Sequence, residues 1–566
     1  MMVPVLRRNL WARSREMSDA RVTSRQHGNL NINIEKACGS WILRKCIHLI
    51  TISHYRWDYL DPKSMTSLAE KSRRSALFVV PSQVLTKGLG FAYFVILART
   101  LSIQDYGVYN FIIGTLIVFS YLCNFGVASS LQRFLPEYEK LGLLGRSLRT
   151  ILLAHGFRLL SSFIVLSLAV ALYDSWAPFF QMGGRSQEFA VFALGTFFLF
   201  QVEYFEIAFE ALFLHPVTST TRVLYTLVKV GGAFFALKAG LAVTGVLAAE
   251  ALGAAAGLGV LLWVFVTRLY GPRRGRLAAD GGVELRRLGR YSGINALVIP
   301  GGILYSHSMD YFVIAALVNP HELGLYALAS RASRTLLSLM PQNVVQGIIR
   351  PAFYERFYSA PDRRAELNRM FQTLVTVVAA FLVPSLCLVS VTGRQFLSVV
   401  FGAKYADATP ILAIFLLFNV FLILDLSSDL VLQAIERVEA RLYGQVFALY
   451  NIAGALVLIQ WFGVAGVAFA TGSAQAMKAF FYFYMARKHA GVSIPWASVG
   501  RIALNSGVAA GVAFAVPSFH WPALHLVVAL TAGGAAYVGM SFANNFMKPA
   551  EKQLFNKLCR RQVFSV

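Results

Sequence analysis

FVILARTLSIQDYGVYNF (94–111) and SMDYFVIAALVNPHELGLYALASR (308–331) are two copies of one pattern, aligned by placing Gly107 on Gly324. In each copy an apolar run is followed by an acidic residue, a glycine and a tyrosine in the same order. A Val-x-Gly-Val motif at 243–246 recurs at 464–467, with nearly the same separation between its copies. Two different pairs of segments match, and the members of each pair are separated by nearly the same number of residues. This indicates that the chain consists of two homologous halves.

The composition places both halves in a membrane. The chain has 566 residues, of which 57% are hydrophobic and only 14% are charged, whereas soluble domains carry roughly 25% charged residues. Apolar runs of about 20 residues, the length that crosses the hydrocarbon of a bilayer, recur along most of the chain. Because only helices and closed barrels satisfy their backbone in lipid, we predict an all-α, multi-pass membrane protein.

Apolar length and charged interruptions predict fourteen transmembrane helices. The predicted spans are 76–98, 108–129, 151–173, 189–214, 223–237, 241–266, 294–317, 323–349, 371–391, 410–432, 442–461, 464–485, 502–519 and 523–542. Six spans in each half form a parallel repeat, with a binding site expected between the two lobes near the midplane. The last two spans lie outside the repeat.

The loops give the orientation. Arginine and lysine cluster at 133–149, 273–290, 350–369 and 437–441, which are loops that follow even-numbered spans. Cytoplasmic loops are enriched in such residues, so both termini are predicted to be cytoplasmic. The same distribution accounts for the net charge of +24 and argues against nucleic-acid binding.

The repeat and the loops define the expected domains. These are a basic cytoplasmic tail over 1–74, an N-lobe over 75–268, a cytoplasmic linker over 269–290, a C-lobe over 291–487, the last two helices over 497–545 and a cytoplasmic tail over 546–566. The first tail is expected to be disordered. Alternatively, the start codon is assigned too early, and translation begins at Met65.

The repeated segments, together with VVFGAKYADATPILAIF (399–415) and NIAGALVLIQWFGVAGVAFAT (451–471), resemble O-antigen and exopolysaccharide flippases. These belong to the multidrug/oligosaccharidyl-lipid/polysaccharide exporter superfamily, and the resemblance covers roughly 70–542. It implies a two-lobed transporter that carries an undecaprenyl-diphosphate-linked oligosaccharide from the cytoplasmic to the periplasmic leaflet by alternating access. It also implies an inner-membrane location, and polysaccharide polymerase and chain-length or export proteins as partners.

Positive charge inside the spans suits such a cargo, because phosphate cannot shed its water unassisted. We predict a diphosphate and sugar path along Lys87, Arg331 and Arg334, with Asp310 as a further residue of that path. Arg331 and Arg334 are three residues apart and are expected to share a helix face. The alternative is that these bases only neutralise nearby acids, Asp310 first among them.

Carboxylates inside the spans have two interpretations. Glu203, Glu206 and Glu210 follow the spacing of one helix stripe. They could couple transport to a proton gradient, or they could pair with Arg158 or Lys229 and hold the lobe together. Asp425 and Asp429 form the corresponding, weaker case in the second half.

Helix breakers within spans are candidate hinges. Pro81 with Gly88 lies in the first span, and Pro300, Gly301 and Gly302 lie in the seventh. Such residues allow bending as the cavity changes sides, although a static kink for packing explains them equally well.

Other classes of membrane protein could also have this sequence pattern. A lipid II flippase or a multidrug or cation antiporter of the same superfamily would share the topology. A membrane polymerase or glycosyltransferase is disfavoured, since the loops are short and no motif for phosphate binding or nucleophilic catalysis is present. The five cysteines show no metal-ligand spacing. We therefore expect a non-enzyme without metal or cofactor, which works as a monomer because the repeat already supplies both lobes.

Overall fold

The computed structural model describes residues 68–277, 280, 282–298, 307–338, 357 and 361–544, and every regular element among them is a helix. The chain divides into a unit of residues 1–72 and a unit of residues 73–566. The helices described below belong to the second unit, apart from the first residues of one of them. The predicted all-α class is confirmed.

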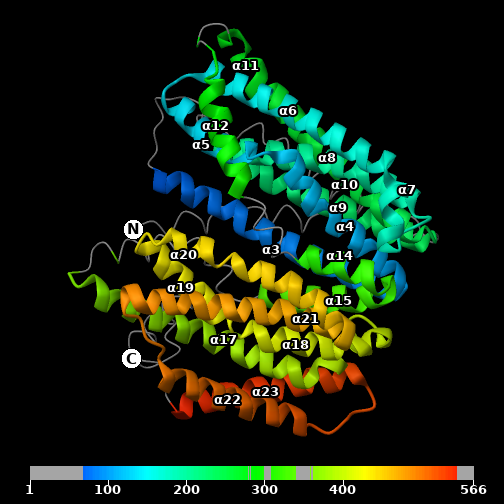
Figure 1. Ribbon diagram of the computed structural model, residues 1–566, viewed down its shortest axis with the longest axis vertical. Coiled ribbons are helices and arrows are strands. Elements are labelled where there is room, and N and C mark those ends of the chain that lie inside the picture. The colour runs from blue at the N-terminus through cyan, green and yellow to red at the C-terminus, as the bar shows by residue number, and fades with distance from the viewer. Residues whose placement is uncertain are drawn as a thin grey trace, which may run out of the picture. The chain divides into compact units, whose positions relative to one another are not determined.

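The N-lobe comprises the helices that precede residue 271 (Figure 1). They are α3 (Leu68–Thr100), α4 (Ile103–Asn124), α5 (Val127–Lys140), α6 (Leu144–Ala171), α7 (Tyr173–Trp176), α8 (Ser186–Ala211), α9 (His215–Lys238) and α10 (Ala242–Val264), with the short η2 (Ala177–Phe180) between α7 and α8. Helices α8, α9 and α10 pack on one another, and α6 lies along α8.

The C-lobe comprises the helices from residue 285 to residue 490. They are α12 (Leu285–Val298), α14 (His307–Leu317), α15 (Pro320–Ser338), α17 (Arg363–Val400), η5 (Ala403–Ala408), α18 (Thr409–Asn419), α19 (Leu422–Ala434), α20 (Val438–Tyr443) and α21 (Val446–Ala490). The last two helices, α22 (Trp496–Ala515) and α23 (Pro522–Asn544), pack beside α17 (Figure 1). Tyr537 of α23 anchors them by donating to the Ala380 carbonyl at 2.7 Å.

Every predicted span overlaps one of these helices, and nine helical segments of the described residues are long and apolar enough to cross a membrane. Parts of the seventh and eighth predicted spans, at 299–306 and 339–349, lie outside the described residues, so the count of fourteen stays a prediction. The fifth span was placed too late: α9 begins at His215 rather than at residue 223. Polar residues in its first two turns hid this start.

Helix α21 is two antiparallel helices joined at Gly463, whose φ of 53° and ψ of −141° interrupt the helix. Across this turn the Tyr450 hydroxyl lies 3.2 Å from the Ser473 hydroxyl. The eleventh and twelfth predicted spans are therefore separate, as expected. Ala242, the equivalent of Gly463 when the two Val-x-Gly-Val motifs are aligned, also has a positive φ, of 40°, at the turn between α9 and α10. A non-glycine residue rarely adopts a positive φ, so a positive φ at the same place in both turns supports the repeat.

The two lobes meet where α4 crosses α15. A Cβ added to Gly107 would overlap the Pro320 carbonyl oxygen, and one added to Gly324 would overlap the Ile103 carbonyl oxygen. Ile103 and Pro320 are equivalent positions in the alignment that places one glycine on the other. The crossing is therefore symmetric, with each copy of the repeated segment touching the backbone of the other. The parallel repeat predicted from the sequence is present in the structure.

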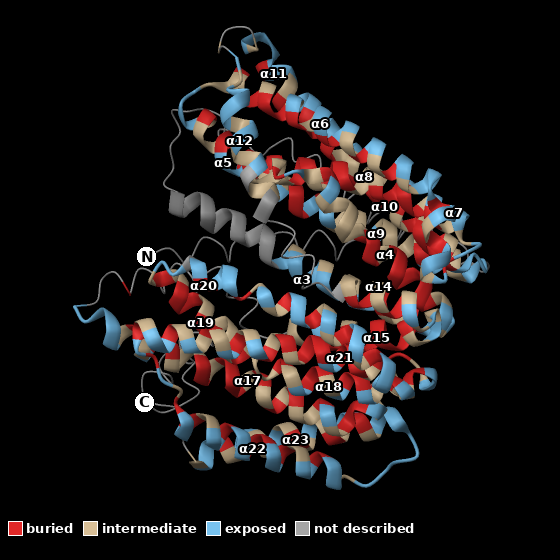
Figure 2. Ribbon diagram, viewed as in Figure 1, coloured by how far each residue is buried: buried red, intermediate tan, exposed pale blue. Residues whose placement is uncertain are grey.

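The outward surface of the helices is strongly apolar. Buried residues lie mainly between helices, whereas many outward positions are exposed (Figure 2). Phe235 is 70% exposed, Trp461 is 74% exposed and Phe514 is 80% exposed. Aromatic side chains in such number would be costly in water, and hydrocarbon is the solvent that accommodates them.

Candidate functional site

Arg331 lies on α15 at the junction of the lobes. Its guanidinium carbon stands 5.1 Å from the centroid of the Phe94 ring, which belongs to α3 of the N-lobe. Its electrostatic neighbours are the phenols of Tyr106, Tyr109 and Tyr311. Because a planar cation lies well against aromatic faces, rings rather than carboxylates hold this charge in place.

Arg334, one turn further along α15, faces a different space. It is exposed, donates to the Tyr311 hydroxyl at 3.2 Å, and lines a cavity of about 250 Å³ in the C-lobe. The two arginines were expected to share a helix face. In the structure Arg331 turns toward Phe94 of the N-lobe and Arg334 toward the interior of the C-lobe, with Tyr311 beside both.

Asp310 and Lys87 do not join the arginines. Asp310 on α14 is 1% exposed and accepts a hydrogen bond from Tyr326 at 2.7 Å. Lys87 lies on the exposed part of α3, as does Gly88. Helix α3 runs without interruption through Pro81 and Gly88. The other predicted hinge residues, Pro300, Gly301 and Gly302, lie outside the described residues.

Two of the three glutamates on α8 share one arginine that the sequence analysis missed. Arg222 on α9 contacts both oxygens of Glu206 at 2.8–3.0 Å and one oxygen of Glu210 at 2.8 Å. Such a forked arrangement is the strong form of the arginine–carboxylate contact. The prediction that Arg158 or Lys229 pairs with these two acids is wrong, because α9 begins early enough to place Arg222 opposite them.

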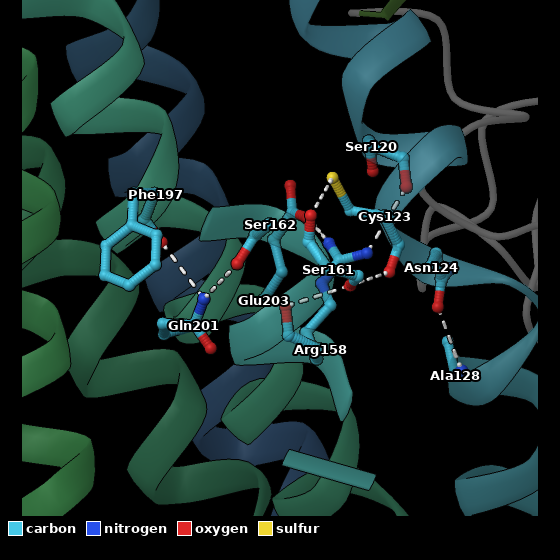
Figure 3. Close-up of polar contacts among 10 residues, drawn as sticks. All are labelled: Ser120, Cys123, Asn124, Ala128, Arg158, Ser161, Ser162, Phe197, Gln201 and Glu203. Atoms are coloured by element: carbon cyan, nitrogen blue, oxygen red, sulfur yellow. Dashed lines mark hydrogen bonds and ion pairs between the residues drawn. The ribbon is translucent and has the colours of Figure 1, made fainter. Parts of the chain in front are cut away.

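The third glutamate pairs as one alternative predicted. Figure 3 shows Arg158 of α6 between Glu203 of α8 and the end of α4. Its guanidinium lies 3.4 Å from Glu203 and donates to the Ser120 carbonyl at 3.3 Å. The guanidinium also stands 4.6 Å from the Phe200 ring centroid. Arg158 therefore ties α4, α6 and α8 together in the middle of the N-lobe.

Lys229 serves a separate cluster. Its ammonium lies 2.8 Å from Glu250 on α10. The same carboxylate oxygen accepts hydrogen bonds from Tyr93 at 2.8 Å and Tyr109 at 2.6 Å. Four helices, α3, α4, α9 and α10, thus meet at one half-buried carboxylate, which pairs with one lysine.

The acids of the C-lobe also have basic partners. Asp425 lies 3.2 Å from the Lys478 ammonium, and Asp429 lies 2.8 Å from Arg441. Glu206, Glu210 and Arg222 of the N-lobe are spaced by four and twelve residues, and so are Asp425, Asp429 and Arg441. The matching spacing was the signal that could have identified Arg222, since the basic residue of each set lies just before a predicted span.

A reciprocal contact closes the lobes at the ends of α3 and α17. Arg99 donates to the Val400 carbonyl at 2.9 Å and also to the Val399 carbonyl. In return, Lys404 donates to the Arg99 carbonyl at 3.2 Å and to the Leu101 carbonyl. The last carbonyls of each helix lack helical partners, so each lobe satisfies those of the other.

Metal ligation has no basis in the described part of the chain, where no three histidine, cysteine or acidic side chains converge. Cys123 and Cys387 are free thiols there.

Residues 72–354 match the model of the family described as polysaccharide biosynthesis protein. Among curated proteins, the chain is 23% identical over 234 residues to the probable low-salt glycan biosynthesis flippase Agl15 of Haloferax volcanii, covering 40% of this chain and 48% of that protein. The chain thus spans about half the length of this relative.

Solved structures show the same fold. The lipid II flippase MurJ in an inward closed conformation has a TM-score of 0.63 at 14% identity, covering 86% of this chain and all of that one. An inward-facing multidrug resistance MATE family transporter has a TM-score of 0.55 at 14% identity, covering 79% and 97%. The resemblance found in the sequence is confirmed, and the chain is a multi-pass membrane protein with a transporter fold.

Proposed function

Because the chain belongs to the polysaccharide biosynthesis protein family, we propose that it flips an undecaprenyl-diphosphate-linked oligosaccharide from the cytoplasmic to the periplasmic leaflet. The observation that carries the proposal is the pair Arg331 and Arg334, held on α15 where the lobes meet. Ser330 to Leu337 stand ten to seventeen residues from the start of α15 at Pro320, or about 15–26 Å along the helix. Counted from an outer surface at Pro320, these positions run from the middle of the roughly 30 Å hydrocarbon layer toward its cytoplasmic side.

The proposed transport cycle is alternating access. The loop charges favour an outer location for four neighbouring places in the chain. These are the end of α3 with Arg99, the starts of α4 and α15 with Gly107 and Gly324, and η5 with Lys404. The lobes are in contact at those ends, so we assign this arrangement to the state that receives cargo from the cytoplasm. In the other state these contacts are broken.

The charge of the site favours an anionic cargo over a cationic drug. Arg331 is surrounded by aromatic rings, and the cavity beside Arg334 contains two bases, Arg334 and Lys478, against one acid, Asp425. A diphosphate meets net positive charge along this path, and a cation meets repulsion.

The remaining parts of the proposal follow from the same function. The protein would lie in the inner membrane with both termini cytoplasmic, act as a monomer, and pass its product to a polysaccharide polymerase and to chain-length or export proteins. The predicted tail over 1–74 is shortened by the start of α3 at Leu68, and the residues before that helix would form a cytoplasmic tail that takes no part in transport.

The test is a flipping assay in sealed proteoliposomes with a short undecaprenyl-diphosphate oligosaccharide. Arg334→Gln removes one charged contact to phosphate, worth about 1.5–3 kcal/mol, so the initial rate should fall roughly 10- to 100-fold. Arg394→Gln is the matched control, because Arg394 is an exposed residue near the outer end of α17. Absence of lipid movement with the unmodified protein, together with export of a cationic dye, would move the protein to the antiporter class.

A further inference from the structure

The cavity beside Arg334 is a built polar site inside the C-lobe. Its volume is about 250 Å³, and its walls come from α15, α18, α19 and the second half of α21. Phe415 and Phe418 supply apolar surface. Asn419, Asp425 and Gln475 supply polar groups. Aromatic walls with a few convergent polar groups are the usual construction of a small-molecule site.

Several polar groups of this cavity are held in place. Asn419 donates to the Ser333 hydroxyl at 2.6 Å, and Lys478 lies 3.2 Å from one oxygen of Asp425. Lys478 also stands 5.6 Å from the ring centroid of Tyr482, which fixes its direction. The site is therefore pre-organised, which lowers the cost of ordering it around a ligand.

Other polar groups of the cavity have unused capacity. The Oδ1 atom of Asp425 is buried and has no hydrogen-bond donor in the described part of the chain. The side-chain amide of Gln475 likewise makes no hydrogen bond to any described residue, although it lines the cavity. A buried acceptor without a donor costs about 1–3 kcal/mol, so a ligand that carries hydroxyl groups would recover this energy.

We propose that this cavity binds the sugar ring attached to the diphosphate of the cargo, with the phosphates at Arg334 and the ring between Phe418, Asp425 and Gln475. This inference rests on the proposed function and adds a determinant of sugar specificity to it. One ring hydroxyl donates to Asp425, and the Gln475 amide contacts a neighbouring hydroxyl or amide substituent. The apolar face of the ring packs on Phe418.

The size and charge of the cavity limit the ligand to that class. Pockets for drug-sized ligands measure roughly 300–1,000 Å³, so about 250 Å³ accommodates one sugar ring and leaves the rest of the oligosaccharide outside. A prenyl chain is excluded by the polar groups, which it would leave without partners. Free phosphate would satisfy Arg334 but would be repelled by Asp425 and would not use Gln475.

The test compares two soluble probes on the purified full chain in detergent. One is farnesyl diphosphate, which has no sugar, and the other is farnesyl-diphospho-N-acetylglucosamine. Dissociation constants are measured by calorimetry for the unmodified protein, for Gln475→Leu and for Asp425→Asn. Gln372→Leu, on α17 outside the cavity, is the matched control for the first change. Asp425→Asn keeps the shape of the side chain and so guards against loss of fold.

We expect the unmodified protein to bind the sugar-bearing probe about tenfold more tightly than farnesyl diphosphate. Gln475→Leu should abolish this difference and leave farnesyl diphosphate binding unchanged, whereas Gln372→Leu should affect neither probe. Equal affinity for both probes in the unmodified protein would overturn the sugar site while the diphosphate path stands. Failure to bind either probe would overturn the proposed function as well.

Discussion

The crossing of α4 and α15 predicts a specific shift in the conformational equilibrium. In Gly324→Ala the new methyl group would overlap the Ile103 carbonyl oxygen and lie 2.9 Å from Ile103 Cγ2. Carbon atoms in good contact are about 3.5–4.0 Å apart, so relief of the Cγ2 contact alone requires a separation of roughly 0.6–1.1 Å. The overlap with the carbonyl oxygen requires more. A new side-chain rotamer of Ile103 cannot relieve both contacts, because the carbonyl oxygen belongs to the backbone.

The cost falls only on the state in which the lobes touch. Overpacking of this kind costs about 1–3 kcal/mol, which changes a two-state ratio by about 5- to 150-fold. The variant should therefore populate a form with the outer ends of the lobes apart. Gly107→Ala should do the same, since its Cβ would overlap Pro320 in the symmetric contact.

The assay measures the distance between spin labels at two exposed outer positions, Ser186 of the N-lobe and Ala403 of the C-lobe. The labels are placed in a chain whose five native cysteines are replaced. Gly156→Ala is the control, because its Cβ would have no atom within 4 Å. Gly324→Ala and Gly107→Ala could both fold and keep the distance distribution of the unmodified protein. In that case the contact between α4 and α15 does not control the separation of the lobes, and the prediction is wrong.

Two further predictions concern ion pairs. Arg222→Gln leaves Glu206 and Glu210 without their shared base, and should lower stability in detergent by about 1–2 kcal/mol, toward the modest end because Arg222 is 44% exposed. A melting temperature that does not fall in Arg222→Gln would contradict the pairing. So would a Glu206→Gln change that lowers the melting temperature by the same amount with and without Arg222. On α5, beyond the apolar part of α4, Arg287 and Arg133 hold the pKa of the Glu137 carboxyl below its usual value. A lowered folded-state pKa gives stability that is present above the ordinary value and lost as the pH falls through the folded value. The protection of α12 amides, corrected for the intrinsic exchange rate at each pH, should therefore fall at low pH, and also in high salt at neutral pH, and Glu137→Gln should remove both responses.

The fold was largely accessible from the sequence because its signals are local. Apolar length marks a span wherever it occurs, and the repeated segments around Gly107 and Gly324 carried the symmetry that the structure places at the lobe crossing. The break at Gly463 was also marked, because a glycine stood between two spans. Boundaries failed where polar residues entered the membrane, as in the first turns of α9.

The partners of the buried acids were less accessible, because they depend on how helices approach one another. Arg158 and Glu203 lie on helices that turned out to be adjacent. Lys229, one of the two alternative partners predicted for the glutamates of α8, pairs instead with Glu250, and nothing in its own helix distinguishes that acid from the others. Lys478 was not singled out at all, although it lies opposite Asp425.

The repeat distinguishes charges that both halves share from charges that only the C-lobe carries. The pairs Glu210–Arg222 and Asp429–Arg441 occur at the same place in both halves, so they are explained by packing that both lobes require.

Arg331 and Arg334 have no such counterparts. When Gly107 is placed on Gly324, their equivalents in α4 are Gly114 and Ile117. When the two Val-x-Gly-Val motifs are aligned, the equivalent of Lys478 is Gly257. The N-lobe thus builds the same helices without any of these three cations. A cation inside a membrane has a large free-energy cost, and the helices that both halves share form without these three cations in the N-lobe. We therefore infer that the bases around the C-lobe cavity serve a ligand. An anionic group joined to a sugar would use both these bases and the polar groups that line the cavity.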